Sequence, residues 1–420
     1  MDLLCDDVQR EIVSHLDSIS GIQNVSKHFK YIANTSKLYF DGHKNSTIFS
    51  LKVLRQYMLH NKDISLFKMP HAVEIDLVTD FNDYNAFDPE LLKEALKQLF
   101  NFTNKKLRLV VNSFSWSLQG LPCFLSKLNK FESILFSGHN YYNINKDLVF
   151  SCKEVHIPGS LYAHIKFENV ASLSLCLDYN INTEIALENI SVRKAFNSQT
   201  TLNELFIYGP FLTCPIFSEF VISSQLLALK TLELHCQLPI WHYARTIQLC
   251  CPNLKNFKIS ASNLITSDLD YFDWNLWPQL KSLSLEDNFT LKDFKNWPSN
   301  LEHLNILDTG LQLLKQKNFE TKKLKTLATS CSTSMRWKSF FKTMPDLEVL
   351  TLKMEHFVSG PQFKSRKNLC PADFWTSFND IKHFNTLSVK FLERLWNKNL
   401  FKEEIQKYLN TEKIQFITLT

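Results

Sequence analysis

The chain has 420 residues, 45% of them hydrophobic and 21% charged, so it can bury a large core and is typical of a globular protein. Its 47 basic and 42 acidic residues leave a net charge of +5, an excess too small to predict nucleic-acid binding. With 8 Gly and 13 Pro, the composition argues against long low-complexity linkers, and no apolar run reaches the roughly 18 residues that a transmembrane helix needs.

The N-terminal residues and the cysteines indicate the compartment. Residues 1–7 include Asp2, Asp6 and Asp7 but no Lys or Arg, so we expect neither a signal peptide nor a mitochondrial presequence. The 10 Cys are scattered through apolar segments, which fits reduced, buried thiols. We therefore expect a protein of the cytoplasm, the nucleus or both, without a membrane partner.

The first 40 residues predict a small helical unit. Apolar residues recur there every three or four positions, as on one face of a short helix. These residues are Val8, Ile12, Leu16, Ile19, Ile22 and Val25. Short helices cannot bury all of this surface among themselves, so we expect something else to cover part of it.

Residues 1–40 resemble the F-box, the motif by which receptor subunits of SCF-type ubiquitin ligases bind a Skp adaptor. The positions that match the motif are Leu4, Asp7, Val8, Leu16, Ile19, Val25, Lys27, Ile32, Leu38 and Tyr39. Cys5 stands where the motif has Pro, and Phe29 where it has Trp. The alternative is a small helical cap on the rest of the chain.

The resemblance implies an adaptor-binding surface. The residues that would contact the Skp adaptor are Leu4, Val8, Ile12, Leu16, Ile19, Ile22, Val25 and Phe29. Through the adaptor, the family's members reach a cullin and its RING subunit. Residues 41–69 are interpreted as a helical linker or cap.

A hexad with apolar residues at its first, fourth and sixth positions recurs in the rest of the chain. The hexads begin at Leu202, Leu229, Leu254, Leu280, Leu301, Leu347, Phe384 and Ile414, and a weaker one, with Thr at its sixth position, begins at Leu324. Weaker versions begin near Val73, Leu107, Phe131, Val155 and Val170. Most starts are about 21 to 27 residues apart, within the period of leucine-rich repeats.

Each hexad predicts a short strand, because its last two apolar residues alternate with one outward residue. We expect the intervals between hexads to hold helices, as at 89–100 after the cap Asp88 and at 335–344. The predicted fold class is therefore α/β: a short helical F-box over residues 1–40, then a leucine-rich repeat solenoid over residues 70–420. Residues 358–373 are interpreted as a projecting basic loop or a solvated connector.

Outward positions on the strands would form the concave face of such a solenoid and bind a protein substrate. The charged and polar candidates near its centre are Glu233, Lys258, Glu286, His303 and Asn305. The alternatives are the convex side and the basic loop at residues 364–367.

No catalytic signature is present in the sequence. It contains no nucleotide-binding loop, HExxH helix, GxSxG elbow or paired CxxC. His235, Cys236, His242, Cys250 and Cys251 fit no zinc spacing, so we expect them to have structural roles. We expect no cofactor, no metal and no active site.

The resemblance implies that the chain is the substrate-recognition subunit of an SCF-type ubiquitin ligase, in the ubiquitin-conjugation pathway. High use of Phe, at 34 residues, together with Asn and Lys hints at an AT-rich genome such as a budding yeast's, so a fungal source is expected. One alternative is a non-catalytic F-box scaffold, for example in a kinetochore or centromere-binding complex, that uses the adaptor without ubiquitylation. A third is a repeat-protein adaptor with no Skp partner.

Overall fold

The chain divides into two compact units, Met1–Leu202 and Asn203–Thr420. The structure is a computed structural model, and it describes the following residues: 37–41, 72–76, 107–112, 131–137, 148–158, 165–176, 201–208, 226–236, 244–261, 267–268, 272–287, 289–290, 297–306, 322–331, 343–354, 376–391, 406–409 and 416–419. Several predicted features lie outside these residues: the helix expected at 89–100, most of the one expected at 335–344, the linker 41–69 beyond its first residue, the basic segment 358–373 and all eight predicted adaptor-binding residues.

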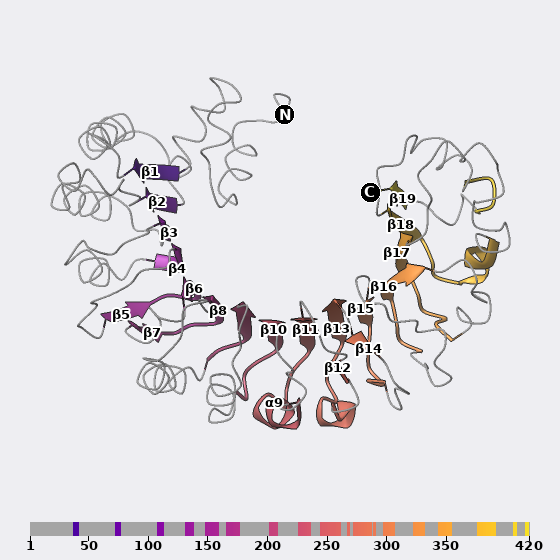
Figure 1. The fold of residues 1–420 in the computed structure, drawn as a ribbon, viewed down its shortest axis with the longest axis horizontal. Coiled ribbons are helices and arrows are strands. Elements are labelled where there is room, and N and C mark those ends of the chain that lie inside the picture. The colour runs from indigo at the N-terminus through magenta and orange to yellow at the C-terminus, as the bar shows by residue number, and fades with distance from the viewer. Residues whose placement is uncertain are drawn as a thin grey trace, which may run out of the picture. The chain divides into compact units, whose positions relative to one another are not determined.

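The first unit contains a parallel sheet (Figure 1). Its strands follow the chain in the order β1 (Lys37–Asp41), β2 (Ala72–Asp76), β3 (Leu107–Asn112), β4 (Phe131–Ser137), β6 (Glu154–Pro158) and β8 (Ser172–Cys176). A separate parallel pair joins β5 (Leu148–Ser151) and β7 (Ile165–Glu168).

The second unit is built in the same way, with each strand parallel to the next. Its strands are β9 (Glu204–Tyr208), β10 (Thr231–Cys236), β11 (Asn256–Ala261), β13 (Ser282–Asp287), β15 (His303–Ile306), β16 (Thr326–Cys331), β17 (Val349–Met354), β18 (Thr386–Phe391) and β19 (Phe416–Leu419). The other described elements are helix α9 (Ala244–Cys250), the 3-10 helices η4 (Trp274–Leu276) and η8 (Ser377–Asp380), and the pair β12 (Ser267–Asp268) and β14 (Phe289–Thr290).

The strands form because apolar and polar residues alternate along them. In β10, Leu232 and Leu234 are buried, while Thr231, Glu233 and His235 remain partly exposed. The parallel register stacks equivalent residues of successive strands, so the buried positions form continuous apolar rows. One such row contains Leu205, Leu232, Phe257, Leu283, Leu304, Leu327, Leu350 and Leu387.

A β-turn before each of several strands directs the first leucine of the hexad into the core. The N–H of Leu254 donates to the carbonyl of Cys251 at 3.3 Å, and that of Leu280 to the carbonyl of Trp277 at 3.1 Å. Pro252 and Pro278 occupy the second position of these turns, where the fixed φ of proline is favourable. The turn and the buried leucine together fix where each strand begins.

The strands that the hexads predict are confirmed. Each of the nine hexads overlaps one strand from β9 to β19, and the weaker upstream segments overlap β2, β3, β4, β6 and β8. The alternation of apolar and polar residues therefore predicts strands correctly in both units.

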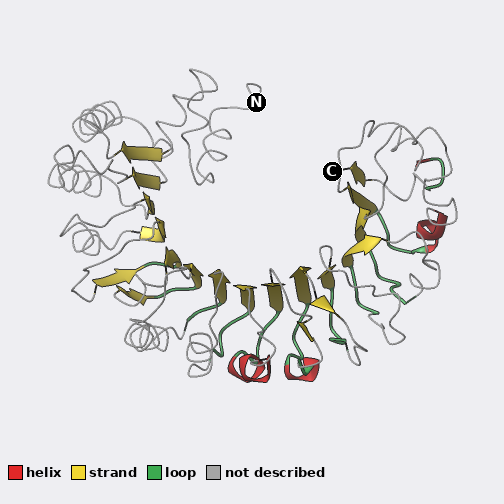
Figure 2. Cartoon of the chain, viewed as in Figure 1, coloured by secondary structure: helices red, strands yellow, loops and turns green. Residues whose placement is uncertain are grey.

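The predicted fold class, a helical F-box followed by a leucine-rich repeat solenoid of α/β type, is wrong. Among the described residues, the structure is a parallel sheet with α9 as the single α-helix, and strands dominate the coloured part of Figure 2. Residues 37–40, the end of the expected helical unit, belong to β1, which pairs with β2. Tyr39 and Phe40 favour strands, and the prolines before several strands favour turns over helix ends.

Helix α9 is attached to the next segment of chain by a buried glutamine. Gln248 is 1% exposed; its Nε2 donates to the carbonyl of Asp273 at 2.8 Å, and its Oε1 accepts from the N–H of Asp273 at 3.0 Å. An aromatic cluster lies nearby: the rings of Phe272 and Trp274 stack at 5.3 Å, and Trp277 packs against Phe257 at 4.9 Å. These contacts position residues 272–277 on the buried side of β10, β11 and β13.

Replacement of Gln248 by Ala should destabilise the chain by about 1–3 kcal/mol, because it removes both partly buried hydrogen bonds that the Gln248 side chain makes with the backbone of Asp273. Urea unfolding followed by tryptophan fluorescence measures the change. Leu249→Ala is the matched control on the same helix, since Leu249 is 61% exposed, and it should change stability by less than about 0.5 kcal/mol. Equal effects of the two substitutions would contradict the role given to Gln248.

Candidate functional site

The outward-facing side chains of the second unit's strands form a polar surface, which we call the open face. It lies on the side of the sheet opposite the buried apolar rows. The outward residues of β10, β11, β13 and β15 are Thr231, Glu233, His235, Asn256, Lys258, Ser260, Ser282, Ser284, Glu286, His303 and Asn305. All five predicted substrate-binding residues therefore lie on one face.

Lys258 connects three neighbouring strands on the open face. It lies directly opposite Glu233 in the register of β10 and β11, and its Nζ is 3.0 Å from Oε1 of Glu233. The same Nζ is 3.2 Å from Oε1 of Glu286 on β13. Opposite charges on adjacent strands attract, so the parallel register itself assembles these three residues.

Two aromatic rings extend this arrangement toward β9. His235 Nε2 lies 2.5 Å from Oε1 of Glu233, and the His235 ring stacks on Tyr208 with centroids 4.6 Å apart and planes 23° apart. Tyr208 and His235 are register partners on β9 and β10. We call Tyr208, Glu233, His235, Lys258 and Glu286 the charged cluster.

The charged cluster holds its ionised groups in their charged forms. Burial alone would raise the pKa of Glu233, whose side chain is 17% exposed, but hydrogen bonds from His235 and Lys258 outweigh it and lower the pKa. Burial alone would lower the pKa of Lys258, but hydrogen bonds to Glu233 and Glu286 raise it. Burial, followed by the charge of Glu233, raises the pKa of Tyr208. The Glu233–Lys258 pair is therefore charged across the neutral pH range.

Asn305 and His303 lie on β15, the strand next to β13 and its cluster residue Glu286. Asn305 Nδ2 donates to Oγ of Ser284 at 3.0 Å, across β15 and β13. His303 is exposed at the start of β15, in register with Ser282 and Thr326. The structure thus assembles three of the five predicted residues and places the other two on the next strand.

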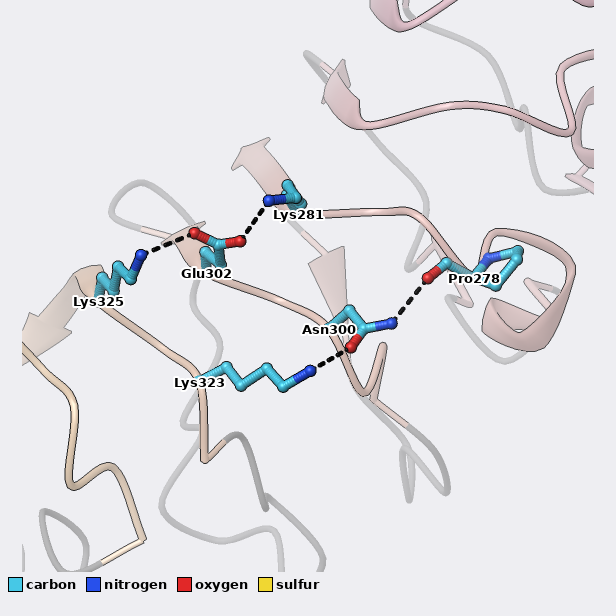
Figure 3. Close-up of polar contacts among 6 residues, drawn as sticks. All are labelled: Pro278, Lys281, Asn300, Glu302, Lys323 and Lys325. Carbon is cyan, nitrogen blue, oxygen red and sulfur yellow. Dashed lines mark hydrogen bonds and ion pairs between the residues drawn. The ribbon is translucent and has the colours of Figure 1, made fainter.

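The sequence reasoning missed Tyr208 and a second charged network. Glu302 lies between Lys281 at 2.6 Å and Lys325 at 3.1 Å, as Figure 3 shows. Hydrogen bonds from Lys281 and then Lys325 lower the pKa of Glu302 to about 2. The sequence signal for this network was the charge of the residue that follows the first leucine of each of these hexads. Tyr208 lies one residue beyond its hexad, aligned with His235 in the next.

Next to this network, a side-chain amide links the turns before successive strands. Asn300 donates to the carbonyl of Pro278 at 2.8 Å and accepts from Lys323 at 2.7 Å (Figure 3). Asn253 makes the equivalent bond to the carbonyl of Leu227 at 2.9 Å. These amides contribute to the alignment of the turns, so their role is structural.

The described residues contain no group of three or more His, Cys, Asp and Glu that could hold a metal ion. His235, a residue considered as a metal ligand, pairs with Glu233 instead, and Cys250 and Cys251 are buried at the end of α9. Burial raises the pKa of both thiols, which favours the neutral, unreactive form. The described arrangement is thus suited to binding through charge and hydrogen bonds.

Comparisons with known proteins provide no identification. No protein-family model matches the sequence, and a search of curated proteins finds no match.

The substitution Glu233→Gln should make stability depend differently on pH. Because the folded-state pKa of Glu233 is lowered, its carboxylate stabilises the fold above its ordinary pKa of 4.5, and this stabilisation is lost as pH falls through the lowered value. We expect Glu233→Gln to be less stable than the original chain by about 1–2 kcal/mol at neutral pH, and equally stable in strong acid.

Urea unfolding midpoints measured across the acidic range provide the comparison. Glu204→Gln, at an exposed position on β9, is the control and should follow the original chain at every pH. A stability difference between Glu233→Gln and the original chain that stays constant down to strong acid would show that the carboxylate's ionisation is not the cause.

Proposed function

We propose that the chain is the substrate-recognition subunit of an SCF-type ubiquitin ligase. Residues 1–40 would bind the Skp adaptor, and the open face of the second unit would bind the protein substrate. The observation that carries this function is the F-box resemblance of the N-terminal residues, centred on Leu4, Leu16, Val25 and Phe29.

The open face supports this function because its charged and polar side chains can bind a protein. Outward residues of adjacent strands repeat at about 4.8 Å, so four strands present a band roughly 15 Å wide. That band contains Glu233, His235, Lys258 and Glu286 of the charged cluster and the Ser284–Asn305 pair. Such a surface binds a protein by matching its charges and hydrogen bonds, and it needs no bond-making group.

In this function the chain performs no chemistry itself. It would bind a protein substrate and raise the effective concentration of that substrate's lysines near the ubiquitin thioester, which the cullin and RING subunit position. The proposed location is the cytoplasm, the nucleus or both. Within the described residues, no helix is long and apolar enough to cross a membrane.

Charge placed among the apolar residues of the N-terminal segment should abolish adaptor binding. The double variant Leu16→Asp, Val25→Asp would bury two carboxylates in the interface, at a cost of several kcal/mol. Co-purification of a tagged Skp adaptor with the full chain should fall by more than about a hundredfold. The matched control, Gln9→Asp with Gln23→Asp, adds the same groups at polar positions that are not part of the motif and should retain the adaptor.

Reconstitution with the adaptor, cullin, RING subunit and ubiquitin-charged conjugating enzyme then separates the ligase from the scaffold. A recognition subunit places its own lysines near the thioester, so ubiquitin should be attached to this chain. Stable adaptor binding without cullin recruitment would favour the scaffold. Adaptor binding that survives deletion of residues 1–40 would contradict the F-box assignment itself.

Reversal of three charges on the open face should release the substrate without affecting the adaptor. The triple variant Glu233→Lys, Lys258→Glu, Glu286→Lys keeps opposite charges in both pairs but reverses the pattern that a partner meets. Quantitative mass spectrometry of complexes from cells should show a protein that is lost from this variant, and that protein's half-life should lengthen. Asp346→Lys, in an exposed turn, is the control for a surface charge change. Unchanged partners and half-lives would move the substrate site away from the open face.

A further inference from the structure

The residue immediately before each strand of the second unit occupies an equivalent position, and we call this set the strand-entry row. Its charged members are Lys230, Lys255, Lys281, Glu302, Lys325 and Glu348, which precede β10, β11, β13, β15, β16 and β17. Backbone hydrogen bonds hold the row together: the N–H of Lys255 donates to the carbonyl of Lys230 at 2.8 Å, and that of Lys281 to the carbonyl of Lys255 at 2.8 Å. Neighbouring members are therefore about one strand spacing, about 4.8 Å, apart.

Charges alternate along the later half of the row. Lys281, Glu302, Lys325 and Glu348 follow one another on four successive strands, and Glu302 binds both of its lysine neighbours (Figure 3). The hydrogen bond to Glu302, and more weakly the charge of Glu348, raises the pKa of Lys325. Alternating charges stabilise the fold without a partner, because opposite charges at neighbouring positions on adjacent strands attract each other.

The earlier half of the row departs from this pattern. Lys230, Lys255 and Lys281 are three like charges in succession, and Lys230 is exposed. Within the described part of the chain, neither Lys230 nor Lys255 forms an ion pair, whereas Lys281 binds Glu302 on its other side. Like charges at adjacent positions repel, so stability of the sheet does not account for this arrangement.

We propose that Lys230, Lys255 and Lys281 form a second binding surface, which takes an acidic segment of a protein partner. The three lysines follow one another within about 10 Å of backbone along the strand-entry row, a span that two or three carboxylates on neighbouring turns of a helix can match. A partner's carboxylates would supply the negative charge that the row lacks there. This surface consists of residues other than the proposed adaptor-binding residues and the outward residues of the open face.

The charge pattern favours an acidic protein over a nucleic acid. A nucleic-acid strand carries a phosphate at every nucleotide and would continue past Lys281 to meet Glu302 and Glu348, which repel it. The basic part of the row is short and ends at an acidic residue, which suits a short segment with a few carboxylates. The net charge of +5 over 420 residues gives no broader basic surface for a polyanion.

A single substitution tests both halves of the inference. Lys255→Glu makes the signs of the row alternate from β10 to β17, so it should raise the melting temperature of the full chain by about 1–2 °C. The same substitution should weaken binding of a fluorescein-labelled peptide of ten glutamates, with an increase in Kd of about fivefold to tenfold in fluorescence anisotropy. Added salt should weaken binding to the original chain.

Lys325→Gln is the matched control, because Lys325 belongs to the same row but lies beyond Glu302, outside the run of three lysines, and pairs with Glu302. Its Kd for the peptide should stay within about twofold of the original. An unchanged Kd in Lys255→Glu, or a lowered melting temperature, would overturn the inference. Tighter binding of a ten-nucleotide oligothymidylate or of phosphatidylserine vesicles than of the glutamate peptide would assign the lysines to another class of partner and equally overturn it.

Discussion

The in-register pairing of parallel strands is the constraint on which the rest of the second unit depends. Once Leu232, Phe257 and Leu283 lie in one buried row, every other position of these strands is fixed relative to its neighbours. The pairing of Glu233 with Lys258 and the stacking of Tyr208 on His235 are both consequences of that register. A shift of one residue would bury these polar groups and expose the leucines.

The strands and much of the candidate site could be predicted because they follow from alternation, which is local in the sequence. Aligning the hexads also places Glu233 opposite Lys258, and the structure has that pair at 3.0 Å. Tyr208 was missed because it lies on β9, one strand before the strands that contain the predicted residues, and its contact with His235 depends on the register. Glu302 was missed because it precedes its strand, and its two lysine partners precede two other strands.

The fold class failed for a different physical reason. A regular interval between parallel strands shows that a connecting segment returns the chain to the start of the next strand, but it does not specify the secondary structure of that segment. Helices were expected because the intervals are long enough to hold them and two intervals have helical patterns, whereas helix α9 is the one α-helix that the described residues contain. Pro252, Pro278 and Pro345 precede β11, β13 and β17, and they favour tight turns at those points. The content of an interval depends on such individual residues and not on the period.

The charged cluster and the strand-entry row show two ways in which one sheet arranges charge. In the cluster, partial burial is balanced by hydrogen bonds, so Glu233 and Lys258 stabilise each other's charged forms. In the row, Lys281 is 54% exposed, and its bond to Glu302 contributes little to stability by itself because water screens it. The cluster is therefore sensitive to pH and to packing, whereas the row responds mainly to salt and to a partner's charge.

The backbone hydrogen bonds just before the strands align neighbouring strands in the same way, whatever the number of residues between them. The interval from the start of β13 at 282 to that of β15 at 303 is 21 residues, and from β17 at 349 to β18 at 386 it is 37. Both junctions nevertheless have the same pair of N–H bonds to one carbonyl, from Glu302 and His303 to Lys281 and from Asn385 and Thr386 to Glu348. Insertions between strands can thus accumulate during evolution without displacing any outward residue, and two chains of different length can present the same surface.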